Sequence, residues 1–529
     1  MDYPLVIGQM LASGLAAAPA QRITYEGLVD MTYAEFGQRV ARLGSALTSL
    51  GLGQGSVVAV MDYDSHRYLE CFFAIPMLGA TLHTVNVRLS PEQVLYTINH
   101  AEDDAILVNA DFLPLLMPLL PRMRPVKLIL LSDRPIPLPD GFAGEYEELL
   151  AEGDPAFPFP DFPETTRATL FYTTGTTGDP KGVTYSHRQL VLHSLGVIAC
   201  FAPVPGRGGV KRDDVYMPLT PLFHVHGWGF PLIATMLGMR QVYPGRYEPM
   251  KLLHLIAEHG VTFSHCVPTV LAMVLGAPES EAVNLSNWKV LVGGSALPEG
   301  LARQALARGI DINAGYGMSE TCPILTVADL TATQGTGAET TAIRIATGKA
   351  APLVQIRVVD PDMRDVPHDG RATGEVVARA PWLTHGYLKN EAGTEALWHG
   401  GWLHTGDVGN MAADGTLRIT DRLKDVIKSG GQWISSLELE SIISAVPGVV
   451  EVAAVGMPDA QWGERPVVLV VARTDVEAAA HAAVASAIAA GRLSKWAAPE
   501  RVVMVEAIPK TSVGKIDKKA IRASLGQRG

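Results

Sequence analysis

A loop rich in threonine and glycine, Tyr172–Gly182 (YTTGTTGDPKG), holds residue types that could bind a polyphosphate. Glycines let backbone N–H groups turn inward, threonine hydroxyls add further donors, and Lys181 supplies a mobile positive charge. The order G-x-x-G-x-P-K differs from a Walker loop, because Pro180 precedes the lysine and no Ser or Thr directly follows it. The residues therefore predict a phosphate-binding loop that is not a Walker loop. The alternative is a flexible surface loop without a ligand.

Two later glycine-rich segments could hold the base and the metal ion of a nucleotide. In Val292–Pro298 (VGGSALP) bare glycine backbone would leave room for a flat purine, although a simple structural turn is the alternative. Gly315–Thr321 (GYGMSET) supplies Tyr316, an aromatic residue able to stack on a purine, and Glu320. Because Mg²⁺ prefers carboxylate and phosphate oxygens, Glu320 is a candidate magnesium ligand.

Two charged segments follow. Asp407 in HTGDVG could accept hydrogen bonds from both hydroxyls of a ribose, although many such aspartates only cap turns. Arg422 in ITDRLKDVIKSGG strengthens the ribose-binding interpretation of Asp407. The alternative is that these charged residues only form a solvent-exposed surface. The last motif, PKTSVGKIDKKAIR at 509–522, contains Lys515 in a Gly-Lys loop within a basic tail.

These motifs, which run from 172 to 522, resemble in family order the adenylate-forming superfamily of acyl-CoA synthetases, peptide-synthetase adenylation domains and luciferases. The resemblance implies that Thr173 and Glu320 hold Mg²⁺ and that Lys515 reaches the carboxylate and the α-phosphate during adenylation. It places Lys424 at the hinge about which a small domain rotates between two half-reactions. The nucleotide- and CoA-binding residues that it implies are Thr173, Thr174, Gly175, Thr176, Thr177, Gly178, Lys181, Gly294, Ser295, Ala296, Gly315, Tyr316, Gly317, Thr321, Asp407, Arg422, Gly430, Gly431, Trp433 and Lys515.

The segment Pro221–Gly229 (PLFHVHGWG) sets two histidines among apolar residues. H-x-H could bind a metal ion, but no third ligand lies near, and a buried, hydrogen-bonded histidine is the ordinary alternative. The resemblance places His224 beside the acyl pocket, as a catalytic residue that shifts when the pocket opens. It also places Trp228 at an aromatic gate between nucleotide and fatty-acid tunnel, with simple pocket lining as the alternative.

Helices and strands must position these motifs. Their signals alternate along the chain, which predicts α/β layers around mainly parallel sheets. We expect helices at 32–50, 68–78, 91–99 and 186–201, and buried strands at 56–61, 105–109, 126–131, 215–219, 261–263, 289–291 and 310–313. Residues 134–163 and 331–342 are expected to be loops. The uncharged stretch 218–239 is expected to be a buried strand-and-loop region rather than a membrane span, because prolines interrupt it.

From Val354 onward short strands at 355–359, 374–379 and 416–420 predict a small β region. Helices at 436–445 and 476–490 and strands at 450–455 and 466–472 then predict a compact α+β unit. The expected fold is α/β, with a large N-terminal adenylation domain, 1–421, built of layered α/β subdomains plus the small β region. A small mobile α+β C-terminal domain, 422–529, carries the adenylation lysine.

Composition narrows the function classes. The net charge of −11 argues against a general nucleic-acid binder, whose phosphate contacts need a basic surface. The four scattered cysteines indicate neither a disulfide framework nor a zinc site, and they fit a reducing compartment. The residues after Met1 lack a basic n-region, so we expect no signal peptide, no stable membrane insertion and a cytoplasmic location. A homodimer is common in the resembled family.

The expected activity is that of an ATP-dependent acyl-CoA ligase in lipid metabolism, with ATP, Mg²⁺ and CoA. A carboxylate attacks the α-phosphate, pyrophosphate leaves, and a thiol displaces AMP from the acyl-adenylate; Lys181 and Lys515 can stabilise the developing charge. FHVHGWG and KSGGQWIS look most like medium- and long-chain fatty acyl-CoA synthetases. The alternatives are a ligase for short or thioether acids such as methylmercaptopropionate, an adenylating protein that loads a carrier-protein thiol, and a non-catalytic nucleotide-binding relative.

Overall fold

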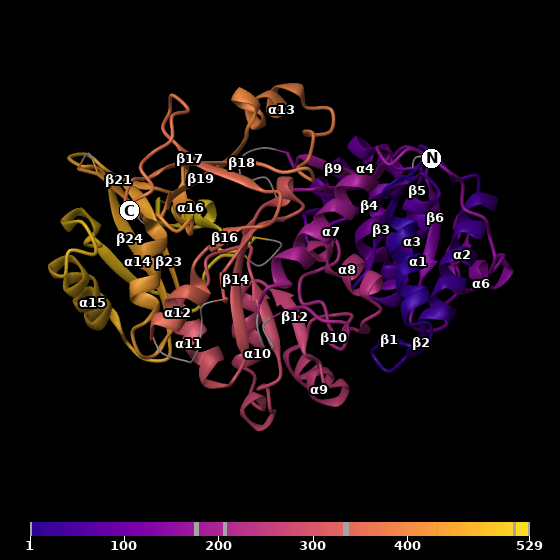
Figure 1. Ribbon diagram of the computed structural model, residues 1–529, viewed down its shortest axis with the longest axis horizontal. Helices are drawn as coiled ribbons and strands as arrows, with labels where there is room; N and C mark the ends of the chain where they lie inside the picture. The colour runs from indigo at the N-terminus through magenta and orange to yellow at the C-terminus, as the bar shows by residue number, and fades with distance from the viewer. Residues whose placement is uncertain are drawn as a thin grey trace.

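The computed structural model describes residues 3–173, 179–204, 209–331, 338–430, 432–511 and 515–526. Within them the strands form four sheets flanked by helices, in a mixed α/β fold with a large N-terminal and a smaller C-terminal part (Figure 1). The helices are α1 (Ile7–Ala17), α2 (Tyr33–Ser49), α3 (His66–Met77), α4 (Pro91–Ala101), α5 (Leu113–Leu116), α6 (Tyr146–Glu152), α7 (His187–Phe201), α8 (Phe230–Leu237), α9 (Pro249–His259), α10 (Pro268–Leu275), α11 (Glu299–Ala307), α12 (Ala338–Ile345), α13 (Glu391–Leu397), α14 (Ser436–Ser444), α15 (Glu477–Ala489) and α16 (Lys518–Gly526).

The first sheet has the order β7-β6-β5-β3-β4-β8-β9 and is parallel except for the antiparallel pair β8 and β9. Its central strands are buried along their whole length, which explains their continuous apolar runs. The strands are β3 (Val57–Met61), β4 (Thr81–Thr84), β5 (Ala105–Asn109), β6 (Lys127–Leu131), β7 (Gly144–Glu145), β8 (Arg167–Tyr172) and β9 (Gly182–Ser186).

The second sheet has the order β16-β15-β14-β13-β12-β10-β11-β1-β2, so the N-terminal hairpin β1–β2 completes one edge. Helix α3 contacts β1 of this sheet and β3, β4 and β8 of the first, and it is buried from His66 to Pro76. It therefore packs between the two sheets. The strands are β1 (Arg22–Tyr25), β2 (Val29–Thr32), β10 (Val215–Tyr216), β11 (Arg240–Tyr243), β12 (Phe263–Cys266), β13 (Lys289–Val292), β14 (Asp311–Gly317), β15 (Ile324–Val327) and β16 (Lys349–Ala350).

The third sheet is antiparallel, in the order β17-β18-β19-β20, and is the small β region that the sequence predicts. Its strands are β17 (Gln355–Val359), β18 (Gly374–Arg379), β19 (Leu403–Met411) and β20 (Leu417–Arg422).

The fourth sheet pairs β22-β21-β24-β23, with β25 on β24, at the end of the molecule opposite the first sheet (Figure 1). It has hydrophobic clusters of its own, built from Ile427 onward. These clusters begin after the domain boundary that the sequence predicts near residue 421. The strands are β21 (Ile427–Ser429), β22 (Gln432–Ile434), β23 (Val449–Asp459), β24 (Gly463–Ala472) and β25 (Arg501–Met504).

Most predicted helices lie within a few residues of their expected limits. Capping boxes begin α2 at Thr32, α4 at Ser90 and α7 at Ser186, where a side-chain oxygen accepts the N–H three residues later. Such caps depend on neighbours in the chain, which is why the sequence reveals them.

Three expectations were wrong. The proline-rich stretch 134–163 contains α6, whose Tyr146 and Leu150 are buried. The stretch 331–342 contains the start of α12, with Thr341 buried, although 332–337 lie outside the described residues. The strand-and-loop region 218–239 contains α8, because Pro231 occupies the first turn, where a helix tolerates proline. Among the described helices, none is both apolar enough and long enough to span a bilayer.

Candidate active site

Thr173 and Lys181 meet at the base of the phosphate hairpin between β8 and β9. The Thr173 N–H donates to the Lys181 carbonyl oxygen at 2.9 Å, and the Lys181 N–H donates to Thr173 Oγ1 at 3.4 Å. The Thr173 hydroxyl and the Lys181 ammonium group, both predicted to bind phosphate, thus belong to residues that are hydrogen-bonded to each other. Lys181 is exposed. The predicted loop residues outside the described ranges are Thr174, Gly175, Thr176, Thr177 and Gly178.

Glu320 is buried in a short helical turn, Ser319–Thr321, that follows β14. The Tyr387 hydroxyl donates to Glu320 Oε1 at 2.6 Å, and Lys181 Nζ lies 4.5 Å from the centre of the Tyr387 ring. Thr321, also buried, accepts the Met318 N–H at Oγ1 at 2.9 Å. Tyr387 therefore links the predicted phosphate lysine to the predicted metal-binding glutamate.

Tyr316, Asp407 and Arg422 form one hydrogen-bonded group. Asp407 and Arg422 are cross-strand partners on β19 and β20, with Arg422 Nε 3.1 Å from Asp407 Oδ1, and the Tyr316 hydroxyl donates to Asp407 Oδ2 at 2.8 Å. Burial raises the pKa of Asp407, while Arg422 and Tyr316 act to lower it. The structure thus brings the predicted base-stacking residue to the two predicted ribose-binding residues.

Lys515 reaches this group from the C-terminal part of the chain. A methyl group placed on Gly294 would lie 3.4 Å from Lys515 Cε, so the lysine packs against the glycine-rich segment after β13. Burial and the nearby Arg422 lower the pKa of Lys515 to about 8, whereas Asp407 and Glu320 act to raise it. The lysine that the resemblance assigns to adenylation therefore lies beside the predicted nucleotide residues, from which it is distant in sequence.

Trp228 packs against the same glycines. A methyl group on Gly293 would lie 3.1 Å from the Trp228 ring and 2.9 Å from the Gly315 carbonyl oxygen, so only glycine fits there. Ser295 and Ala296 follow on an exposed turn. Gly317 likewise has no room for a side chain, because a methyl group would meet the Pro323 carbonyl oxygen. Gly293 and Gly317 therefore allow neighbouring backbone segments to pack closely against these glycine-rich turns.

His224 precedes a left-handed turn that runs from Val225 to Gly229, in which Val225, His226 and Trp228 all have positive φ angles. L-residues adopt such angles at a cost, so the surrounding contacts must hold the turn in place. Burial lowers the pKa of His224 to about 3, and Lys515 and Arg88 act in the same direction. His224 is therefore neutral at physiological pH. Lys515 is close enough to act on its charge.

Family models decide the identity of the chain. The model of the AMP-binding enzyme family matches residues 14–388, and that of the AMP-binding enzyme C-terminal domain matches residues 438–515. The chain belongs to the AMP-binding enzyme family. The predicted resemblance is confirmed.

Two relatives match this AMP-binding enzyme over most of its length. It is 40% identical over 500 residues to a long-chain-fatty-acid–CoA ligase of Thermus thermophilus, covering 93% of this chain and 89% of the relative. It is 36% identical over 536 residues to a 3-methylmercaptopropionyl-CoA ligase of Ruegeria pomeroyi, covering 99% and 97%. The crystal structure of the anthranilate CoA ligase AuaEII in complex with anthranoyl-AMP matches it with a TM-score of 0.88 at 22% identity, covering 100% and 98%. This last likeness shows the fold.

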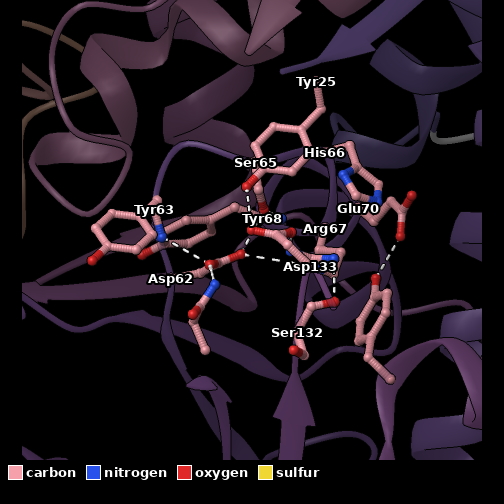
Figure 2. Close-up of polar contacts among 12 residues, drawn as sticks. Tyr25, Asp62, Tyr63, Ser65, His66, Arg67, Tyr68, Glu70, Ser132 and Asp133 are labelled. Carbon is pink, nitrogen blue, oxygen red and sulfur yellow. Dashed lines mark hydrogen bonds and ion pairs between the residues drawn. The ribbon is translucent and has the colours of Figure 1, made fainter. Parts of the chain in front are cut away.

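A second possible site in the AMP-binding enzyme is the carboxyl edge of the first sheet, where ligands bind in many α/β proteins. At the ends of β3 and β6, Figure 2 shows side chains of the enzyme's own residues gathered together, among them Asp62, Arg67 and Asp133. Asp62 accepts hydrogen bonds from Ser65 at 2.5 Å and from Asn109 at 2.7 Å, and Arg67 pairs with Asp133. This buried network joins the ends of β3, β5 and β6, so we regard it as structural.

Gly430, one of the residues predicted to face CoA in the AMP-binding enzyme, directly follows β21, whose antiparallel partner is β22. Its N–H donates to the Trp462 carbonyl oxygen at 3.0 Å. A methyl group on Gly430 would lie 2.7 Å from the Trp496 ring. Gly431 and the Trp433 side chain lie outside the described residues. In the turn after β20, burial and Arg422 lower the pKa of Lys424, the predicted hinge residue.

Sequence reasoning missed two residues beside the predicted site. Tyr387 lies in THGYLKN, in the segment between β18 and α13, where the Gly-Tyr pair was the signal available. Asp64 accepts the Leu222 N–H at 2.8 Å and the Tyr247 hydroxyl at 2.5 Å, and it thereby holds the segment that leads to His224. Burial raises the pKa of Asp64 to about 7. No local pattern marks Asp64, because its partners come from other parts of the chain.

Proposed function

We propose that this enzyme converts a medium- or long-chain fatty acid, ATP and CoA to acyl-CoA, AMP and pyrophosphate through an acyl-adenylate. Its class, an AMP-forming acid–thiol ligase, follows from its family and relatives. The observation that carries the mechanism is Lys515 beside Gly294 and the Asp407–Arg422 pair. The fatty acid is supported by the relative from Thermus thermophilus, which is named a long-chain-fatty-acid–CoA ligase.

In the proposed first half-reaction, a carboxylate oxygen of the acid bonds to the α-phosphorus of ATP, and the bond to pyrophosphate breaks. Negative charge moves onto the leaving pyrophosphate, where Lys181 lies in reach from the phosphate hairpin. Lys515 neutralises the carboxylate and the α-phosphate as they approach. Tyr316 stacks on the base, while Asp407 and Arg422 hold the ribose.

Glu320 and Thr173 provide the carboxylate and hydroxyl oxygens that suit Mg²⁺, and Glu320 keeps one oxygen, Oε2, outside its hydrogen bond to Tyr387 Oη. These residues fit the ion, and they would hold it against the phosphates. When bound, Mg²⁺ would neutralise phosphate charge and fix the geometry of the leaving pyrophosphate.

In the proposed second half-reaction, the thiolate of CoA attacks the acyl carbonyl carbon and AMP leaves. Lys515 has no role in this step, so the C-terminal domain, 422–529, can rotate about Lys424 and withdraw it. Gly430, Gly431 and Trp433 would then face the pantetheine arm. We propose that the enzyme acts as a homodimer in the cytoplasm.

A second candidate substrate is a short or thioether acid. The His265 ring lies 5.2 Å from the Trp228 ring, and the Phe230 ring stacks on His265 at 4.9 Å, all three side chains being buried. These rings fill space that a long acyl chain would need if its tunnel ran past Trp228. The relative from Ruegeria pomeroyi, which is named a 3-methylmercaptopropionyl-CoA ligase, favours this candidate.

AMP release in the presence of CoA, measured across propionate, methylmercaptopropionate, octanoate, palmitate and benzoate, tests both candidates. A maximum at octanoate or palmitate would support the fatty acid. A maximum at the two short acids would refute the fatty acid but keep the mechanism. No turnover with any acid, despite ATP binding, would point to a carrier-protein thiol instead of CoA.

A further inference from the structure

Residues 384–388 form a strap that joins the phosphate hairpin to the turn bearing Glu320. The Leu388 N–H donates to the Gly182 carbonyl oxygen at 2.8 Å, and Tyr387 forms an antiparallel bridge with Val183 on β9. At the other end the Thr384 N–H donates to the Glu320 carbonyl oxygen at 3.0 Å. Backbone hydrogen bonds on both sides therefore set the position of Tyr387.

The Tyr387 side chain makes two different contacts across this gap. Its ring face lies 4.5 Å from Lys181 Nζ, a distance at which the ring attracts a cation, and its hydroxyl donates to Glu320 Oε1 at 2.6 Å. One side chain thus holds a cation and an anion of the proposed ATP site.

We propose that Tyr387 is a positioning residue for the magnesium complex of ATP. The hydroxyl occupies Glu320 Oε1 and leaves Oε2 to meet the metal ion, and the ring keeps the Lys181 ammonium aimed at the terminal phosphates. This inference rests on the proposed function, because it assumes that Lys181 and Glu320 bind the triphosphate and its metal ion.

The two contacts can be separated by substitution. Tyr387→Phe keeps the ring beneath Lys181 but removes the hydroxyl, so Glu320 Oε1 loses its donor and the carboxylate can rotate. Tyr387→Ala removes both contacts. Tyr185→Phe is a matched control, since the Tyr185 hydroxyl donates to the Ser319 carbonyl oxygen at 2.6 Å, one residue from Glu320, rather than to the Glu320 carboxylate.

The experiment measures the equilibrium binding of a fluorescent ATP analogue to the full-length wild type and the three variants, with Mg²⁺ and with EDTA. The quantity compared is the factor by which Mg²⁺ lowers the Kd. Thermal unfolding of each variant shows whether it is folded, and ATP–pyrophosphate exchange at varied Mg²⁺ separates KM from kcat.

Tyr387→Phe is expected to reduce the gain in affinity from Mg²⁺ by about three- to tenfold while leaving the Kd in EDTA within about twofold of wild type. Tyr387→Ala should also weaken binding in EDTA, because Lys181 loses its support, and Tyr185→Phe should match the wild type. In exchange assays Tyr387→Phe should raise the Mg²⁺ requirement more than it lowers kcat at saturating Mg²⁺.

An unchanged Mg²⁺ gain in Tyr387→Phe would overturn the inference, and so would an equal change in Tyr185→Phe, which would indicate a general loosening of the turn. If the wild type binds no ATP analogue, the proposed function itself fails. Binding by the wild type with no difference among variants refutes only the role of Tyr387.

Discussion

Raising the pH should switch off adenylation by removing the proton of Lys515. Its pKa of about 8 means that the ammonium form falls from about nine-tenths of the molecules at pH 7 to about one-tenth at pH 9. Burial and Arg422 lower this pKa because both disfavour a charge there. If only the protonated lysine neutralises the carboxylate and α-phosphate, kcat/KM for ATP should fall about tenfold between pH 7 and pH 9.

ATP–pyrophosphate exchange isolates this step, since it needs no CoA. The variant Lys515→Arg keeps its proton throughout this range, so its profile should be flat even if its absolute rate is lower. His224 should not contribute, because its pKa of about 3 leaves it neutral from pH 7 to pH 9. Lys424 is the other amine nearby with a lowered pKa, so Lys424→Arg serves as the matched control.

Two results would refute this reasoning. A wild-type profile without a fall between pH 7 and pH 9 would show that the charge of Lys515 is not required or that its pKa stays high. A fall that persists in Lys515→Arg but disappears in Lys424→Arg would assign the titration to Lys424 instead.

The remaining predictions concern the half-reactions and the fold. Lys515→Ala should slow acyl-adenylate formation about 10²- to 10³-fold while sparing thioester formation from supplied acyl-adenylate; equal loss in both steps would contradict its role. Lys424→Pro should spare adenylation and slow thioester formation, and an unchanged second step would argue against a hinge. Arg67→Met should lower the free energy of unfolding in urea by about 3–5 kcal/mol, because Asp62 loses its buried counter-charge. The exposed control Arg122→Met should lose less than about 1 kcal/mol, and similar losses in both would count against the buried network.

The elements whose signals are local could be predicted well from sequence. Thr32 and Ser90 cap helices through residues three positions away, and β17 and β18 have the predicted bounds because alternating and apolar runs mark short strands directly. Helix α6 was missed because prolines on both sides of it dominate the pattern. Helix α8 was missed because its Pro231 breaks a helix interior but not a first turn.

The sequence by itself determined the residue types of the proposed site and their order, because each motif carries its own glycines, hydroxyls or charges within a few positions. Only the tertiary structure decided which of them meet. Lys515 reaches Gly294 because the C-terminal part packs over α11, where Gly300 lies against the Ser444 carbonyl oxygen of α14. Tyr387 lies between Lys181 and Glu320 because its strap bonds to β9 and to the turn after β14. Such contacts join segments far apart in the chain, so long-range packing and hydrogen bonding, rather than any local pattern, create them.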